Sequence, residues 1–427
     1  MEGLDLRFRV PSTDLLLLPW LEPLEQWDAT VVPIRDVPVG PSRHLVRFVE
    51  ADRALWALKV LPLSVATREY DVLRDLEERS LPAVRPAGVV VQPFPDTAIL
   101  LTRYLEGSWQ YRRLFMRVPV TMVKHRARLF DAMAALLVDL HRNGVYWGDC
   151  SLANTLFKRD GQLLQAWLVD AETSAIHPSL SDGQRIDDLE IMVENVAGGL
   201  LDVAARLEEP PEDNESLFEE ALSLRRRYEA LWDVLQEQPL VRLGDRHEVE
   251  ARLRRLNDLG YVVDEVRLVS GETGDDQLRL QVAVAERGFH AAELRRIAGL
   301  DVGEGQAVVL LNDLQAYRTR LAAAGMEVSE GEAAHRWVHE VLEPGMAKAH
   351  EALGGVGDPV QAYCDLLEVR WLLSELAGHD VGDEPALETL RRRAAPLESA
   401  AAMGVAELAT QEVPVVGRRE PPELGGL

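Results

Sequence analysis

The feature that most restricts the fold of this chain is a series of five strand-like stretches with one helix inserted after the third. Apolar and β-branched residues fill each stretch, and turn-forming residues separate them. In the helix, Val72, Leu73 and Leu76 share one face, as expected of an amphipathic helix. The predicted strands are residues 30–37, 44–49, 54–61, 88–92 and 98–104, and the predicted helix is 65–79.

The following hundred residues read as mostly helical. Residues 126–142 carry apolar side chains at helical spacing, and a second helix is expected over 185–201. Two brief strands, 155–158 and 166–169, lie between these helices. A run of strands followed by a run of helices is typical of an α+β fold.

A segment rich in Glu and Pro, 206–215, is the predicted linker to a second unit. Beyond it the chain is predicted to be mostly helical over 216–380, with a β-hairpin near 261–285. The tail, 411–427, is expected to be disordered. The helices expected in the second unit are 216–237, 246–259, 291–324 with a break near Gly303, 332–353 and 359–377.

The composition excludes some classes of protein. The 427 residues include 71 acidic and 46 basic side chains, for a net charge of -25, which argues against binding to nucleic acid or to an anionic membrane surface. The chain has two cysteines, Cys150 and Cys364, and no run of about 18 apolar residues that suits a membrane span. We therefore expect a soluble, cytoplasmic protein.

Lysine is scarce, so each lysine position is informative. Four of the 46 basic residues are lysines, at positions 59, 124, 158 and 348. Lys59 lies late in the third predicted strand, and Glu69 lies in the helix that follows. Asp149 and Asn154 share one short loop, and Asp170 ends an apolar strand.

These five residues, in this order, resemble the protein-kinase-like superfamily over roughly residues 30–205. The resemblance implies phosphoryl transfer from ATP, with Lys59 contacting the phosphates and Glu69 orienting Lys59. Asp149 would position or deprotonate the accepting hydroxyl, and Asn154 and Asp170 offer hard oxygen ligands for Mg²⁺.

The resemblance also implies a two-lobed kinase-like fold and a nucleotide contact at Tyr104 and Leu105, where the fifth predicted strand ends. Its parts are a lead-in over 1–29, a five-stranded antiparallel N-lobe over 30–106 and a helical C-lobe over 107–205.

The chain departs from the protein-kinase pattern at several positions. Gly40 stands almost alone where a Gly-rich phosphate loop is expected, and Trp147 and Gly148 replace the His and Arg of His-Arg-Asp. Ala171-Glu172 replaces Phe-Gly after Asp170. The motif form is more similar to small-molecule kinases: aminoglycoside and choline phosphotransferases, and lipopolysaccharide-core sugar kinases.

The second unit, over roughly 210–380, resembles a bacterial domain of unknown function that often follows such a kinase-like region. The resemblance rests on short motifs and implies no chemistry. These motifs include Arg225-Arg226-Arg227-Tyr228, Arg336-Trp337-Val338 and Asp358-Pro359.

Two assignments among the glutamates near the predicted site have alternatives. Glu77 and Glu78 compete with Glu69 as the partner of Lys59, although Glu69 shares the inward face of its helix. Glu172 is either a further metal ligand or a solvated neighbour.

Other polar residues have a structural interpretation. Asp187 and Asp188 either complement the dipole of their helix or brace the catalytic loop. His141 is interpreted as scaffold, and His335 and His339, four residues apart on one helix, as a surface pair.

The sequence therefore predicts an ATP- and Mg²⁺-dependent kinase with an unknown hydroxyl acceptor, either a small molecule such as a sugar or a protein. The alternative is a pseudokinase that serves as a nucleotide sensor or as a scaffold for protein partners. The second unit is expected to select the acceptor, bind a partner or mediate self-association.

Overall fold

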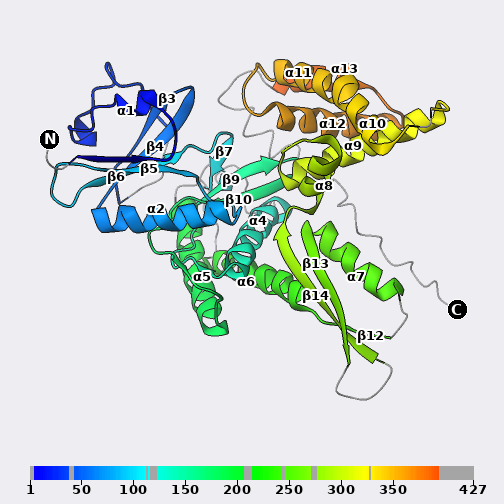
Figure 1. Ribbon diagram of the computed structural model, residues 1–427, viewed down its shortest axis with the longest axis horizontal. Coiled ribbons are helices and arrows are strands. Elements are labelled where there is room, and N and C mark those ends of the chain that lie inside the picture. Colours follow the sequence, from blue (N-terminus) through cyan, green and yellow to red (C-terminus); the bar gives the residue numbers. More distant parts are fainter. Residues whose placement is uncertain are drawn as a thin grey trace.

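The structure is a computed structural model that mixes helices and strands, as the predicted α+β class requires (Figure 1). It describes residues 4–37, 43–111, 114–115, 123–205, 214–242, 246–270, 277–326 and 328–393. Gly40, most of the predicted linker and the predicted disordered tail lie outside the described residues. Within the described part of the chain, each helix is too short or too polar to cross a lipid bilayer.

The N-terminal sheet has six antiparallel strands in the order β1-β5-β6-β4-β3-β2, so the predicted count of five is wrong. All five predicted strands are present, although the first is only two residues long. The sixth strand, β1, comes from the predicted lead-in and pairs with β5. The strands are β1 (Asp5–Phe8), β2 (Ile34–Arg35), β3 (Val46–Ala51), β4 (Ala54–Leu61), β5 (Pro86–Val91) and β6 (Ala98–Arg103).

The rest of the lead-in also folds. It forms α1 (Thr13–Leu16) and a short 3-10 helix, Leu24–Gln26. Its buried Trp20 and Trp27 pack in one core with apolar side chains of the sheet. The lead-in is therefore part of the N-terminal unit.

Helix α2 (Leu63–Glu78) lies against strands β5 and β6. Its N-terminus follows Pro62, and the Asp96 carboxylate accepts a hydrogen bond of 3.1 Å from the Leu63 N–H. The buried stripe of α2 is apolar except for one carboxylate, Glu69. Because it belongs to this stripe, the Glu69 carboxylate points toward the sheet.

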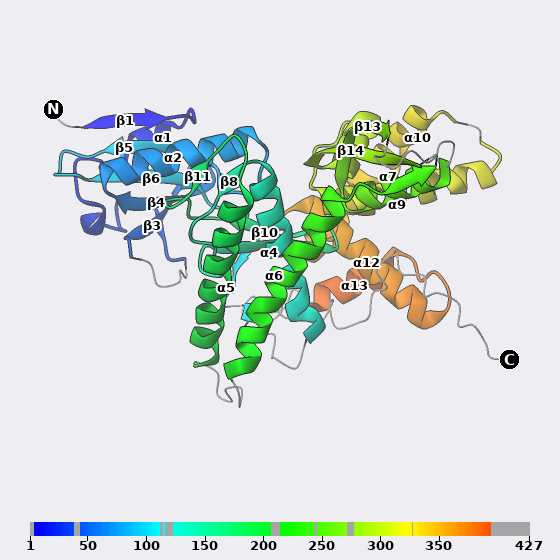
Figure 2. The same cartoon turned by 90° about the horizontal axis from the view of Figure 1, so that it is seen from below.

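The next part of the chain packs three long helices with two small sheets. Figure 2 shows α5 (Asp182–Ala204) and α6 (Asn214–Gln236) side by side, and both also belong to the core around α4 (Val123–Arg142). One sheet has the order β10-β9-β7, and the other pairs β8 with β11. These strands are β7 (Ser108–Gln110), β8 (Val145–Tyr146), β9 (Thr155–Asp160), β10 (Leu163–Leu168) and β11 (Ala175–Ile176).

The hydrophobic cores do not divide the chain at the predicted linker. Tyr228 of α6 and Tyr261 of the predicted hairpin belong to the same core as α4 and α5. A separate core begins at Leu294. The domain limits remain predictions. The buried residues after the hairpin belong to the second core instead of the first.

The hairpin and the helices beyond it match the predicted pattern and extend it. A third strand, β12 (Leu240–Arg242), joins the hairpin strands β13 (Tyr261–Ser270) and β14 (Gln277–Arg287), and α7 (Arg246–Asp258) precedes them. The helices of the second core are α8 (Phe289–Ala298), α9 (Glu304–Ala323), α10 (Glu330–Trp337), a π-helical turn Val338–Leu342, α11 (Glu343–Ala352), α12 (Pro359–Ala377) and α13 (Asp383–Arg393).

The sixth strand can be tested at Gly88, which pairs with Phe8. A Cβ at this position would overlap the Arg7 carbonyl oxygen and the Phe8 ring. We expect Gly88→Ala to lower the free energy of unfolding by about 2 kcal/mol, because overpacking displaces β1. Urea unfolding measures this loss. The control is Gly198→Ala in α5, where a Cβ meets no atom within 4 Å and where we expect a gain of up to about 1 kcal/mol. A neutral Gly88→Ala would contradict the role of β1.

Candidate active site

Lys59, Glu69 and Asp170 meet between the sheet, α2 and the segment that follows β10. The Lys59 Nζ atom lies 3.1 Å from Glu69 Oε2 and 2.7 Å from Asp170 Oδ2. The competing Glu77 pairs with Arg9 instead, and Glu78 lies 3.6 Å from Arg74. The predicted pairing of Lys59 with Glu69 is therefore present.

A third carboxylate completes this cluster. Glu172 Oε2 lies 3.7 Å from Lys59 Nζ and 3.3 Å from His44 Nε2, yet it is buried without a hydrogen bond. Oxygen atoms of Glu69, Asp170 and Glu172 lie within 4.8 Å of one another, a spacing that suits a metal ion. The cluster has more negative charge than one ammonium neutralises. Hard carboxylate oxygens are also the ligands that Mg²⁺ prefers.

The excess of negative charge appears in the pKa values. Burial, followed by the charge of Asp170, raises the pKa of Glu69 to about 7, although Lys59 opposes the shift. Burial acts against the charged form of Lys59, but the charges of Glu69 and Asp170 outweigh it and raise the Lys59 pKa. Lys59 is therefore kept in its charged form. Glu69, the most buried of the three carboxylates, retains a proton to a higher pH than an exposed glutamate.

Asp149 lies in the loop after β8, where two amides hold its carboxylate. Asn154 Nδ2 donates to Asp149 Oδ2 at 2.9 Å, and Asn195 Nδ2 of α5 donates to Oδ1 at 2.8 Å. Burial first, and the charge of Asp170 in addition, raise the pKa of Asp149, while the two amides oppose the shift. Asp149 is thus oriented from both sides and is a stronger base than an exposed aspartate.

Asn195 is a functional residue that could not be identified from the sequence. Its local signal is an amide on the helix face that also carries the buried Asp188 and Met192. The contact with Asp149 spans 46 residues, so no local pattern could reveal it.

A second carboxylate, Asp188, holds the backbone of the loop. It is fully buried and accepts hydrogen bonds from the N–H groups of Trp147 (2.7 Å) and Gly148 (2.9 Å). Its third partner is His141 Nε2, at 3.0 Å. Of the two aspartates considered, Asp188 therefore braces the loop, whereas the exposed Asp187 accepts from the Tyr146 hydroxyl.

The brace extends beyond the predicted linker. The Tyr228 hydroxyl, from α6, lies 2.8 Å from His141 Nδ1. The His141 ring therefore bridges the Asp188 carboxylate and the Tyr228 hydroxyl. His141 is scaffold, as expected, and Tyr228 is a supporting residue that sequence reasoning assigned only to a motif.

The backbone explains why glycine replaces the usual arginine before Asp149. Gly148 has a φ of 76°, a left-handed conformation that strains other residues. A Cβ there would also lie 3.0 Å from the Thr173 carbonyl oxygen. The preceding Trp147 is fully buried and its indole N–H donates to the Asp170 carbonyl oxygen at 3.4 Å. The two departures from His-Arg-Asp thus link the loop to the segment around Asp170.

Tyr104 and Leu105 lie apart from these contacts, just after β6. The Tyr104 N–H donates to the Leu55 carbonyl at 2.9 Å, and its ring packs edge-on against Phe48. The Leu105 carbonyl accepts from the Ser108 hydroxyl at 2.7 Å. Their role at the nucleotide remains a prediction.

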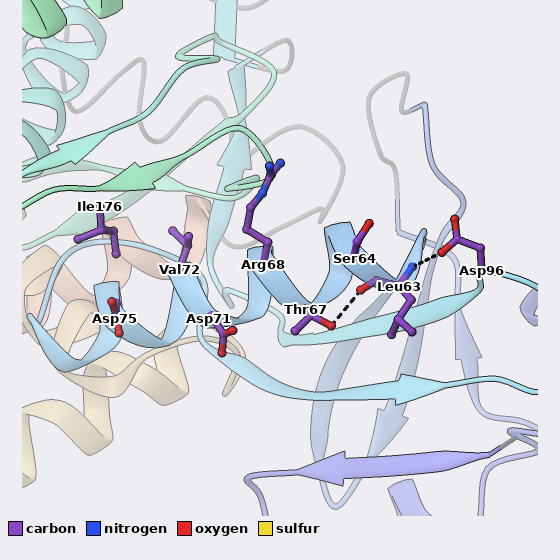
Figure 3. A pocket seen from close by; sticks show the side chains of 9 residues that line it. All are labelled: Leu63, Ser64, Thr67, Arg68, Asp71, Val72, Asp75, Asp96 and Ile176. Atoms are coloured by element: carbon purple, nitrogen blue, oxygen red, sulfur yellow. Dashed lines mark hydrogen bonds between the residues drawn. The ribbon is translucent and has the colours of Figure 1, made fainter.

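A surface depression lies on the opposite face of α2 from Glu69. It has a volume of about 690 Å³, and Figure 3 shows the side chains that line it. Arg68 points from this groove toward the segment after Asp170 and donates to the Glu172 carbonyl oxygen. The groove itself contains none of the predicted site residues.

The Asp188 brace can be tested by removing its charge. In Asp188→Asn, one oxygen is replaced by an N–H donor that faces other donors. We expect a loss of about 3 kcal/mol in the free energy of unfolding, measured with urea, because buried donors lose a charged acceptor. The matched control is Asp187→Asn, with an expected loss below about 1 kcal/mol. Equal losses in the two variants would contradict the brace.

Glu69 should make stability depend on pH. As the pH rises from about 4.5 to about 7, the unfolded chain releases the Glu69 proton while the folded chain retains it, so stability is lost over this window. Glu69→Gln has no such proton. We expect the stability of the wild type relative to Glu69→Gln, measured by urea unfolding, to fall as the pH rises from about 5 to about 7.5. Glu78→Gln, exposed on the same helix, is the control; a flat difference for Glu69→Gln would contradict the shifted pKa.

The comparisons with known proteins divide the chain into two matched regions. Residues 48–205 match the Lipopolysaccharide kinase (Kdo/WaaP) family. Residues 230–393 match a Domain of unknown function (DUF4032). No curated protein matches the chain.

Among solved structures, one described as "WaaP in complex with acyl carrier protein" is similar at 15% identity and a TM-score of 0.32. The match covers 54% of this chain and 90% of that chain. The family matches confirm the expected resemblance: residues 48–205 are similar to the Kdo/WaaP lipopolysaccharide kinase family, and residues 230–393 are similar to a domain of unknown function.

Proposed function

We propose that this protein is an ATP- and Mg²⁺-dependent kinase that transfers a phosphoryl group to a hydroxyl of a sugar-type acceptor. The observation that carries the proposal is the meeting of Lys59, Glu69 and Asp170 beside the loop that orients Asp149. The match to a lipopolysaccharide kinase family supports both the reaction class and the sugar-type acceptor.

The first requirement of phosphoryl transfer is a fixed cation for the phosphates. Lys59 is 14% exposed, and Glu69 holds its ammonium at a defined position. Because the pKa of Lys59 is raised by its neighbours, it stays charged while one side remains accessible. In the proposed two-lobed arrangement, the six-stranded sheet and α2 supply this cation from one side of the nucleotide.

The residues present also fit a bound Mg²⁺. Asp170, Asn154 and the neighbouring Glu172 offer oxygen ligands. A divalent cation would reduce the repulsion among the crowded carboxylates. When bound, Mg²⁺ neutralises charge that develops on the phosphates. The chain's own contribution is to hold these oxygens: the Glu172 N–H donates to Asp170 Oδ1 at 3.1 Å, and Asn154 is fixed through Asp149.

Asp149 acts on the acceptor. Each of its oxygens receives one amide N–H, which leaves further lone pairs to accept the proton of a hydroxyl. Its raised pKa makes this transfer more favourable than it would be for an exposed aspartate. Asn195 and Asn154 thus orient the base, and Asp188 and His141 hold its loop.

The alternative is a pseudokinase that binds nucleotide without turnover. The contacts on Asp149 weigh against it, because a nucleotide-binding scaffold does not require an oriented base. The Gly40 segment, which bears on this alternative, lies outside the described residues.

Replacing the proposed base separates these functions. We expect Asp149→Asn to reduce Mg²⁺-dependent ADP formation from ATP by at least about 100-fold, with ATP binding retained in a melting-shift assay. Asp202→Asn, an exposed carboxylate of α5, is the control. Equal turnover in the wild type and Asp149→Asn would remove Asp149 from catalysis. A wild type that binds ATP without turnover would favour the pseudokinase, and a wild type with no ATP-dependent melting shift would contradict both.

A further inference from the structure

The turn between β9 and β10 carries an unusual buried carboxylate. Asp160, 7% exposed, ends β9 and accepts hydrogen bonds from the N–H groups of Gly305 (2.8 Å) and Gln306 (2.9 Å). These two N–H groups open helix α9 of the second core. Helices are usually capped by a Ser, Thr, Asp or Asn at their own N-cap position. Here the N-cap is Gly303, and the capping carboxylate comes from a strand 145 residues earlier.

The packing around this carboxylate leaves no room for side chains. A Cβ at Gly303 would overlap the Asp160 carboxylate, and a Cβ at Gly305 would overlap the Asp160 carbonyl oxygen. From the other side, a Cβ at Gly161 would overlap the Gly305 backbone, and Gly161 also has a φ of 61°. The glycines let the two backbones meet directly.

Helix α12 holds the same turn. The Gln361 side-chain amide accepts from the Gly161 N–H at 2.8 Å and donates to the Gly161 carbonyl at 3.0 Å. Arg159 forms ion pairs with Asp365 (2.8 Å) and Glu368 (3.1 Å) of that helix. We call Asp160 and Gly161, together with Gly305, Gln306 and Gln361, the turn clamp.

The opposite end of the same hairpin carries the proposed metal ligands. Asn154 immediately precedes β9, Asp170 follows β10 after one residue, and the Val169 N–H donates to the Asn154 carbonyl at 3.1 Å. Between the two ends, β9 and β10 pair without a register shift from Asp160–Leu163 to Thr155–Leu168. A regular ladder of about 20 Å is a stiff connection.

The hairpin of β9 and β10 also makes contacts along its length, between the turn and the proposed site. Phe157 and Leu168 are fully buried in the core around α4. On its other edge, β9 pairs with β7, which begins three residues after Leu105. The continuous ladder therefore connects the turn directly to the end that holds Asn154 and Asp170.

We propose that the helical region 289–393 positions the metal-binding end of the kinase-like site through the turn clamp, with Asp160 and Gln361 as positioning residues. The inference rests on the proposed function, because it assigns Asn154 and Asp170 to a Mg²⁺-nucleotide complex. It gives the domain of unknown function a defined task within the same chain.

The test is the gain in ATP affinity that Mg²⁺ provides, measured by titration calorimetry on the full chain with and without Mg²⁺. We expect Asp160→Ala to lose at least fivefold of the Mg²⁺-dependent gain, while ATP binding without Mg²⁺ changes less than twofold. Gln361→Met, which keeps the side-chain length but removes the hydrogen bonds to Gly161 together with those to Gln306 and Asp365, should give the same pattern and replaces Asp160→Ala if that variant does not fold. Arg159→Lys, which keeps the charge that faces Asp365 and Glu368, should retain most of the gain.

The control is Ser329→Ala, which removes the cap of α10 in the same helical region without touching the hairpin. It should lower the melting temperature and leave the Mg²⁺-dependent gain unchanged. If the clamp variants keep the gain and only melt earlier, as Ser329→Ala does, the clamp is structural and the inference is wrong. If the wild type itself shows no Mg²⁺-dependent ATP binding, the proposed function fails and the inference falls with it.

Discussion

The contact on which the site depends is the ion pair of Lys59 with the buried carboxylate of Glu69. Glu69 is 1% exposed and lies in the apolar stripe of α2, so this pair joins the helix to strand β4. Burying both charges costs desolvation energy, which apolar residues in their place would avoid. Asp170 and Glu172 crowd the same ammonium and add repulsion among the carboxylates. A cluster that is unfavourable by itself but would be relieved by a divalent cation and phosphates is consistent with a binding site rather than a structural ion pair.

A second buried carboxylate, Asp188, stabilises the loop before Asp149. The loop before Asp149 leaves two backbone N–H groups inside the protein, at Trp147 and Gly148, and Asp188 accepts both. Since unpaired buried donors are costly, this carboxylate fixes the loop and therefore the direction of Asp149. His141 also contacts Asp188, and the Tyr228 hydroxyl contacts the other ring nitrogen of His141. The position of Asp149, the proposed base, is thus tied to a hydroxyl from α6.

Local chemistry explains what the sequence could predict. The kinase-like resemblance implied the pairing of Lys59 with Glu69, and the inward face of one helix favoured Glu69 over Glu77 and Glu78, because helix periodicity places these side chains. Asn195, Tyr228 and Asp160 act across 46, 87 and 145 residues, and no periodicity reports such distances. Strand β1 was missed because its alternation of polar Asp5 and Arg7 with apolar Leu6 and Phe8 is only four residues long. The linker composition at 206–215 does not mark a boundary of the core, which continues into α6 and the hairpin.

These long-range contacts show why the two matched regions are better regarded as one mechanical unit. The kinase-family match ends at residue 205, and the second match begins at residue 230, within α6. Yet Tyr228 of that helix supports the loop of Asp149, and Arg126 of α4 pairs with Glu220 of α6 at 2.5 Å. Asp160 of the kinase-like region also caps α9, a helix of the second core. The boundary between the families therefore crosses a continuous core, and the residues between them supply contacts that the kinase region alone lacks.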